Sequence, residues 1–303
     1  MILKALFCIV VLSMVYVSTE RRPAVTQLEN GLFSISHENV SFLINPAIGA
    51  RVISAKVGQK ELLLQERNEL LNWGATFWPA PQRDWNWPPP QAFQYGEYVP
   101  EIKGNRLILT GATDPKLGLR VVKTFSFDEV KNCLEIEYQI INESDSVANV
   151  GPWEIVCVPA AGSKVFLSLG AEPENVNSSL AFENHAGIGW FDHDSADLLP
   201  NQKLFNNTPE GWLAHINRDG ILFIKTFEVI PAGELAPGQG NAEVYVSKKF
   251  EYIELENHGK FAHLKPQESL HYKVRWFMSE LPAGISSSIL SDELIDHVRS
   301  VTK

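Results

Sequence analysis

The strongest candidates for proton chemistry are two glutamates near the end of the chain. Glu254 and Glu256 lie two positions apart within residues 250–257. On a β-strand this spacing puts both carboxylates on one face, together with Tyr252, because successive side chains alternate between faces. Two carboxylates a few ångströms apart raise each other's proton affinity, which suits acid/base catalysis or metal binding. The alternative is the solvated outer face of an edge strand.

A third glutamate, Glu154, interrupts an otherwise apolar segment. If residues 132–142 and 147–158 form a hairpin, Glu154 lies opposite Glu135. Like charges directly opposite each other are unfavourable unless a cation, a proton or an arginine intervenes. Either this register is wrong or Glu154 belongs to a site.

The same hairpin bears on Cys133 and Cys157, two of the three cysteines. Cys133 would lie opposite Val156, so Cys157 would point to the other side of the sheet. A disulfide between them would require a bulge, for which Gly151 and Pro152 are candidates. The sequence leaves the disulfide open.

A tryptophan-rich segment offers a different chemistry. Four of the eight tryptophans fall within residues 73–87, namely Trp73, Trp78, Trp85 and Trp87. The prolines at 79, 81 and 88–90 argue against a helix and against a central strand, so we expect an ordered loop. Aromatic rings beside Gln82 and Arg83 suit a sugar, which needs a flat apolar surface and hydroxyl partners. The alternative is that the tryptophans close one end of a β-sandwich.

Other sites receive little support from the sequence. His185 and His193 lie near aspartates, but their spacing is too loose to indicate a metal site. The sequence contains no Gly-rich phosphate loop, no Cys-x-x-Cys pair, no His-Glu-x-x-His motif and no Gly-x-Ser-x-Gly elbow. We therefore predict no cofactor and no metal site, although the sequence does not settle whether Ca²⁺ binds.

Short strand patterns must position these residues. We predict strands at residues 33–36, 40–44, 51–57, 61–64, 106–110, 119–127, 132–142, 147–158, 211–216, 221–227, 242–247, 250–257 and 269–279. Asp219-Gly220 is a strong hairpin signal. Only residues 286–301 indicate a helix, which we expect to cap one end of the domain. The pattern predicts an all-β sandwich or barrel, formed as one domain over residues 25–303.

The N-terminus and the charge concern location and partners. Lys4 precedes an apolar run of about thirteen residues, the length of a signal-peptide core and short for a membrane span. We predict a signal peptide at residues 1–19 and a secreted or periplasmic protein; the alternative is an uncleaved anchor. The net charge of −10, without a basic cluster, argues against nucleic acid or an anionic membrane surface.

Three segments together resemble the galactose mutarotase-like (aldose epimerase-like) superfamily, nearest to a branch known only as a domain of unknown function. Residues 40–54 resemble the family's first hairpin, and residues 73–79 are similar to its Trp-Pro segment. Residues 251–276 resemble its ending, in which a carboxylate strand precedes a Pro-Gly-Glu-Ser turn. The resemblance implies a large antiparallel β-supersandwich that binds a sugar on a concave sheet.

The departures from the family pattern concern catalysis. The family's His-Gly-Phe-x-Arg segment corresponds here to residues 91–95, so Gln91 and Tyr95 replace its sugar-binding side chains. The family's second histidine, the usual general acid, falls near Trp153 and Glu154. The C-terminal carboxylate carries over as Glu254, with Glu256 as the alternative.

Two functions follow from the resemblance and from these departures. In the first, the protein is an epimerase-type isomerase that interconverts anomers, with Glu254 as base and Glu154 as proton donor. In the second, it binds carbohydrate without catalysis, because the family histidines are missing. A sandwich without a sugar site is the third alternative. The expected sugar contacts are Trp78, Gln82, Arg83, Trp85, Trp87, Gln91 and Tyr95.

Overall fold

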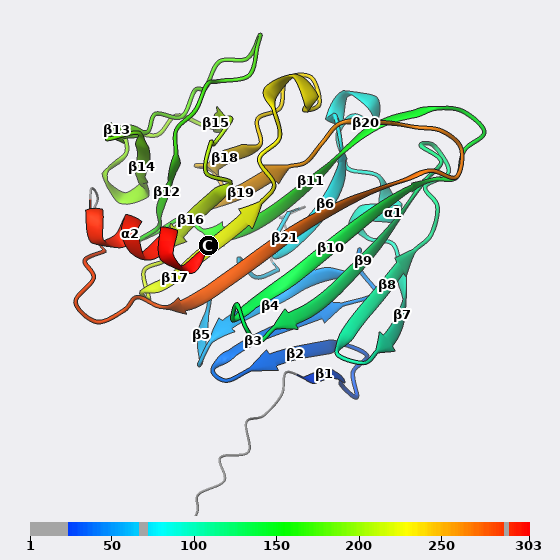
Figure 1. Cartoon of the computed structure of the whole chain (residues 1–303), viewed down its shortest axis with the longest axis horizontal. Helices are drawn as coiled ribbons and strands as arrows, with labels where there is room; N and C mark the ends of the chain where they lie inside the picture. The colour runs from blue at the N-terminus through cyan, green and yellow to red at the C-terminus, as the bar shows by residue number, and fades with distance from the viewer. Residues whose placement is uncertain (1–23, 67–71, 288–290) are drawn as a thin grey trace, which may run out of the picture.

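Two antiparallel sheets pack face to face in the computed structural model, which describes residues 24–66, 72–287 and 291–303 (Figure 1). The eleven strands of sheet A are β1 (Ala24–Gln27), β2 (Phe33–His37), β3 (Val40–Asn45), β4 (Arg51–Val57), β5 (Lys60–Glu61), β6 (Ala75–Ala80), β11 (Ala148–Pro159), β15 (Gln202–Asn206), β18 (Ala242–Ser247), β19 (Tyr252–His258) and β20 (Ala262–Leu264). Nine of them run in the order β1-β2-β3-β4-β6-β11-β19-β18-β15, while β5 pairs with β4 and β20 with β11.

Sheet B has ten strands: β7 (Tyr98–Lys103), β8 (Arg106–Gly111), β9 (Leu119–Asp128), β10 (Cys133–Asn142), β12 (Lys164–Ser168), β13 (Glu183–His185), β14 (Ile188–Asp192), β16 (Trp212–Ile216), β17 (Ile221–Phe227) and β21 (Ser269–Glu280). Their order is β13-β14-β12-β16-β17-β21-β10-β9-β8-β7. The helical elements are α1 (Gln91–Gln94), α2 (Asp292–Val301) and the 3-10 turns η1 (Gln82–Asp84), η2 (His193–Ser195) and η3 (Ala232–Glu234). The all-β prediction is confirmed.

The core between the sheets follows from alternation along the strands. In β9 every second residue is buried, because one face of the strand packs on sheet A and the other faces solvent. Lys123 occupies one of these inward positions and donates to the Gly49 carbonyl at 2.6 Å. A separate apolar cluster covers the opposite face of sheet A and includes Trp78, Trp153 and Tyr252. Sheet A is therefore covered on both faces in this region.

The predicted hairpin of residues 132–142 with 147–158 is wrong. In the structure β10 pairs with β9 and β21 in sheet B, whereas β11 pairs with β6 and β19 in sheet A. The chain crosses between the sheets in the connection that the sequence pattern suggested as a tight turn. Glu135 consequently lies opposite Arg275, not opposite Glu154. Cys133 and Cys157 are free, buried thiols in different sheets.

The tryptophan-rich segment begins as a strand, contrary to the predicted loop. Strand β6 contains Pro79 and pairs with β11 along its whole length. Proline fits because its Cα partner in β11 is Pro152, so neither residue offers an N–H across this pair. On the other side, β4 pairs with β6 through the Cα partners Val52 and Ala75. The Pro79 carbonyl accepts instead from the indole of Trp85, at 2.7 Å.

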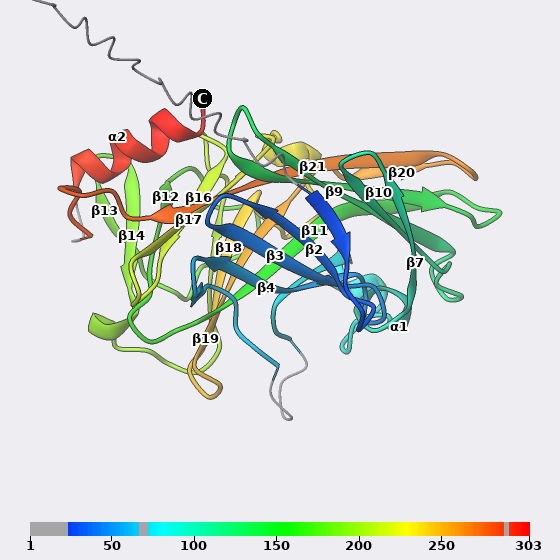
Figure 2. The same cartoon turned by 90° about the horizontal axis from the view of Figure 1, so that it is seen from below.

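Two other expectations are confirmed with adjusted boundaries. The Asp219-Gly220 hairpin joins β16 to β17, and Gly220 has the positive φ, +74°, that such turns favour. The C-terminal helix begins later than predicted, where the hydroxyl of Ser291 caps it by accepting from Leu294 N–H. Figures 1 and 2 both show α2 at the end of the molecule that also carries β12, β13 and β14.

The predicted signal peptide at residues 1–19 lies outside the described residues. Within the described ranges, none of the helices has the length and apolar character needed to cross a membrane.

Candidate functional site

A cleft of about 790 Å³ opens on the face of sheet A that points away from sheet B. Strands β6, β11, β19, β18 and β15 form its floor, and η1 with the residues after it forms one rim. The lining residues are Asn72, Trp78, Gln82, Trp87, Trp153, Pro200, Asn201, Lys203, Tyr245, Ser247, Lys249, Phe250, Tyr252 and Glu254. The predicted site residues Trp78, Gln82, Trp87 and Glu254 thus come together in one cavity.

Strand register explains why these side chains meet. Across β15, β18, β19 and β11, residues Lys203, Tyr245, Glu254 and Cys157 are successive Cα partners. Directly paired residues in antiparallel strands point to the same face. The row above it contains Glu243 and Glu256. Both rows therefore point to the same face of sheet A, where Lys203, Tyr245 and Glu254 line the cleft while Glu243 and Glu256 are buried.

Four tryptophans make the wall at the other end of the floor. Trp78 and Trp153 are Cα partners in β6 and β11, and their rings meet edge to face with centroids 5.1 Å apart. Trp87 packs on Trp78 at 5.9 Å, and Trp85 lies behind both strand tryptophans. Trp87 is 50% exposed, whereas the other three are buried. Trp87 is thus the member of this tryptophan wall that offers the most surface to a ligand.

Glu254 combines access to the cleft with an unusual protonation state. One of its carboxyl oxygens accepts from the Asn72 amide at 2.7 Å. Burial, and then the neighbouring Glu256, raise the pKa of Glu254 to about 8, although Asn72 and Lys203 act in the opposite direction. Glu254 therefore holds a proton at neutral pH and can exchange it with a bound molecule.

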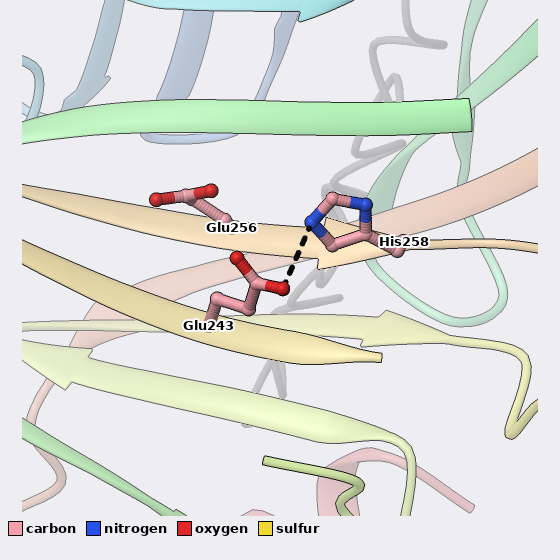
Figure 3. A group of neighbouring side chains, drawn as sticks. All are labelled: Glu243, Glu256 and His258. Atoms are coloured by element: carbon pink, nitrogen blue, oxygen red, sulfur yellow. Dashed lines mark ion pairs between the residues drawn. The ribbon is translucent and has the colours of Figure 1, made fainter. Parts of the chain in front are cut away.

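Glu256 lies beside Glu254 but below the surface, next to Glu243. Figure 3 shows these two carboxylates and the His258 imidazole converging from β18 and β19. Their nearest ligand-type atoms all lie within 4.8 Å of one another, a spacing that could hold a metal ion. Lys203 already supplies a positive charge there, because its ammonium lies 2.6 Å from Glu243 and 2.8 Å from Glu256.

The charges of this buried group depend on one another. Although burial alone would lower the pKa of Lys203, the carboxylates of Glu243 and Glu256 outweigh it and raise that pKa. Burial favours the neutral form of Glu243, but Lys203 and His258 overcome it and lower the pKa of Glu243 to about 2. His258 stacks on Trp153 with ring centroids 5.1 Å apart. The ion cluster and the tryptophan wall are therefore one packed unit.

Glu154, the expected proton donor, lies on the opposite face of sheet A. It is fully buried between the sheets and contacts residues of sheet B: Tyr138 donates to it at 2.7 Å, and the Lys225 ammonium lies 2.9 Å away. The structure does not bring Glu154 and Glu254 together. The anomalous glutamate in the apolar strand is explained by a buried ion pair.

The remaining predicted sugar contacts do not line the main cleft. Arg83 lines a second cavity of about 550 Å³ that lies beyond η1, next to Glu174 and Gln239. Trp85 supports the wall from behind, with its indole N–H on Pro79. Gln91 and Tyr95 are exposed residues at α1 and do not line the main cleft.

Several lining residues carried no recognisable sequence signal. Lys203 lies in a stretch with weak periodicity, and β15 was not predicted there. Asn72 precedes the tryptophan-rich segment, and the backbone around it is held because Arg51 donates to the Trp73 carbonyl. Tyr245 would have been found by pairing β18 with β19, since it is the Cα partner of Glu254.

Comparisons with known proteins bear on the family and the fold. A family model described as a domain of unknown function (DUF4380) matches residues 78–279. A TPR-domain containing protein from Parabacteroides distasonis ATCC 8503 is 14% identical with a TM-score of 0.58, covering 86% of this chain and 49% of that one. This chain thus spans about half the length of that protein.

Among the matching solved structures, several are covered over nearly their whole length, as two examples show. A galactose mutarotase-like protein from Lactobacillus casei ATCC 334 is 12% identical with a TM-score of 0.57, covering 82% of this chain and 100% of that one. A galactose mutarotase related enzyme from Lactobacillus acidophilus is 10% identical with a TM-score of 0.54, covering 83% and 98%. No curated protein matches the chain. These likenesses confirm the galactose mutarotase-like β-sandwich fold.

Proposed function

The chain belongs to the DUF4380 family, and from its cleft we propose that it binds a carbohydrate. The observation that carries the proposal is the tryptophan wall beside polar groups in a cavity of about 790 Å³. The exposed face of Trp87 suits the apolar side of a sugar ring. Gln82, Asn72 and Glu254 supply amide and carboxyl groups for its hydroxyls. The galactose mutarotase-like fold supports this proposal without identifying the sugar.

A second candidate function is interconversion of anomers by acid/base catalysis, favoured by the protonation state of Glu254. Opening a sugar hemiacetal requires one group that accepts a proton and another that donates one. Glu254 can accept when ionised. Its Cα partner Tyr245 also lines the cleft and replaces Glu154 as the proposed donor, since a phenol keeps its proton at neutral pH.

The two functions differ in their pH dependence. The ionised form of Glu254, which the base requires, increases as the pH rises through about 8. Catalysed anomer exchange should therefore accelerate between pH 6 and pH 8, whereas simple binding does not require this ionisation. We further propose that the protein is exported, on the basis of the apolar run after Lys4.

Tryptophan fluorescence titration with a panel of aldoses tests binding, and exchange NMR on the same sugars tests catalysis. A saturable fluorescence change that disappears in Trp87→Ala supports binding in this cleft. Anomer exchange at the uncatalysed rate with wild-type protein that still binds sugar would exclude the isomerase. Absence of any response across the panel would reject carbohydrate binding altogether.

A further inference from the structure

Glu254 is the carboxyl group that lines the cleft. Two buried carboxylates, Glu243 and Glu256, lie beside it on β18 and β19, and the Lys203 ammonium contacts both. That ammonium forms its ion pairs with Glu243 and Glu256. Among the described residues, no cation forms an ion pair with Glu254. Lys249 also lines the cleft, but its ammonium lies over the Phe250 ring, 4.6 Å from the centroid.

A second observation points to a missing donor at the same place. Asn72 is 3% exposed, lines the cleft and donates its amide N–H to Glu254. Within the described part of the chain its carbonyl oxygen, Oδ1, is buried and receives no hydrogen bond. An unsatisfied buried acceptor costs about 1–3 kcal/mol. Asn72 thus presents an amide oxygen that needs a donor, beside a carboxyl group, Glu254, that has no ion-pair partner among the described residues.

Aromatic rings line the same cleft as Asn72 and Glu254. Tyr245 and Tyr252 are two of them, and Tyr245 is the Cα partner of Glu254. The faces of such rings attract a cation, by about 0.5–1 kcal/mol at exposed sites and by more when the cation is desolvated. An ammonium group has the charge that the rings and an ionised Glu254 favour, and it has the N–H donors that the Asn72 oxygen needs.

We propose that the ligand of this cleft is an amino sugar, whose ammonium group binds between Glu254 and the Asn72 carbonyl while its ring lies against the tryptophan wall. The inference rests on the proposed carbohydrate binding and adds the chemical class of the ligand. A hydroxyl could satisfy the Asn72 oxygen, but it could not act as the counter-ion of an ionised Glu254.

Binding of a cation here should release a proton. The groups facing Glu254 are Cys157 from β11, Tyr245 from β18, Lys203 from β15, and Tyr252 and Glu256 from its own strand. With a pKa of about 8, Glu254 is protonated at pH 6 in the free protein. An ammonium beside it favours the carboxylate, so the proton leaves as the amino sugar binds.

Isothermal titration calorimetry at pH 6, with glucosamine and glucose as the probes, tests the inference. At that pH the amine is protonated, since amino groups of this kind titrate near about 7.7–8.0. We expect glucosamine to bind at least about tenfold more tightly than glucose. Titrations in two buffers with different ionisation enthalpies should show release of close to one proton with glucosamine and none with glucose.

Two variants make the test specific. Glu254→Gln keeps the shape of the side chain and should remove both the preference and the proton release. Glu251→Gln is the matched control, because Glu251 is an exposed glutamate just before β19, and it should behave as wild type. If Glu254→Gln does not fold, N-acetylglucosamine serves the same purpose with wild-type protein: lacking the charge, it should bind no better than glucose.

The outcomes separate the inference from the function on which it rests. Equal affinity for glucose and glucosamine, or glucosamine binding without proton release, overturns the amino-sugar inference and leaves carbohydrate binding in place. Failure of all three sugars and of the wider aldose panel rejects both.

Discussion

Glu243 and Glu256 are Cα partners on neighbouring strands, with both side chains fully buried. Like charges in such a pair repel, and each loses its hydration. The Lys203 ammonium, within 2.8 Å of both, makes the arrangement stable. Lys203 therefore offsets the repulsion between two carboxylates of sheet A.

Removing that lysine should destabilise the protein strongly. We expect Lys203→Met to lower the free energy of unfolding at pH 7 by about 3 kcal/mol, because it removes the ammonium that pairs with two buried carboxylates. Urea denaturation measures the loss, with Lys265→Met as an exposed control that should change little. A variant as stable as wild type would show that the carboxylates need no counter-ion.

The pH dependence of this loss has a defined sign. The pKa of Glu243 is lowered to about 2 in the folded protein, against 4.5 ordinarily. Its ionised form stabilises wild type above pH 4.5, and that stabilisation is lost as the pH falls towards 2. The difference between wild type and Lys203→Met should therefore shrink on acidification. A constant difference from pH 7 to pH 3 would contradict this assignment.

Trp87 should matter for binding far more than for stability. We expect Trp87→Ala to weaken sugar binding about tenfold, while unfolding free energy falls by only about 1 kcal/mol because the ring is half exposed and packs mainly on Trp78. Calorimetric titration and urea denaturation measure the two effects. Val130→Ala, which truncates an exposed side chain far from the cleft, is the control for both measurements.

Glu154 should matter for stability and not for binding. Glu154→Gln breaks the buried pair with Lys225, and we expect a loss of about 3 kcal/mol in unfolding free energy with unchanged sugar affinity. Glu137→Gln, which alters surface pairs with Arg106 and His271, should cost less than about 1 kcal/mol. If the Glu154→Gln protein folds but no longer binds the sugar, Glu154 belongs to the binding site.

Lys123 should make stability rise with pH. Burial, followed by repulsion from Arg51, lowers its pKa to about 7 in the folded protein, from 10.5. Between these values the unfolded chain binds more protons, so wild type gains on the order of 1 kcal/mol per pH unit as the pH rises. Lys123→Met should lack this component between pH 7 and 9.5, whereas Lys131→Met on the surface should keep it. If the unfolding free energies of wild type and Lys123→Met change with pH in the same way, this prediction is wrong.

Local patterns predicted the strands but not their sheets. The alternation in β9 and β10 follows from one buried and one solvated face, which a sequence displays directly. Whether β11 continues the sheet of β10 depends on contacts between distant residues, such as the pairing of Trp153 with Trp78. The neighbouring patterns alone favoured a hairpin, and that hairpin is wrong.

The site was predictable to the extent that its residues were grouped in sequence. The tryptophan-rich segment was recognisable from its composition, and the Glu254–Glu256 pair from its spacing. Members of both line or support the cleft. Lys203 and Asn72 come from stretches without periodicity, and only the folded register brings them to Glu254. Pro79 shows the opposite kind of error. The rule that proline does not occur in a central strand predicted a loop, but Pro79 lies in β6 opposite a second proline, Pro152.

Strand β15, which carries Lys203, is the last strand of sheet A and pairs with one strand, β18. Its outer edge is held by Ser178 and Ser179, whose hydroxyl oxygens accept from the Phe205 and Lys203 amides. Edge strands open locally at lower free energy than central ones. Local opening of β15 would withdraw the Lys203 ammonium from both buried carboxylates at once, so the pairing of this edge strand and the charge beneath the cleft are linked. Amide hydrogen exchange at Lys203 and Phe205 would therefore measure how often β15 opens and the Lys203 ammonium leaves the two carboxylates.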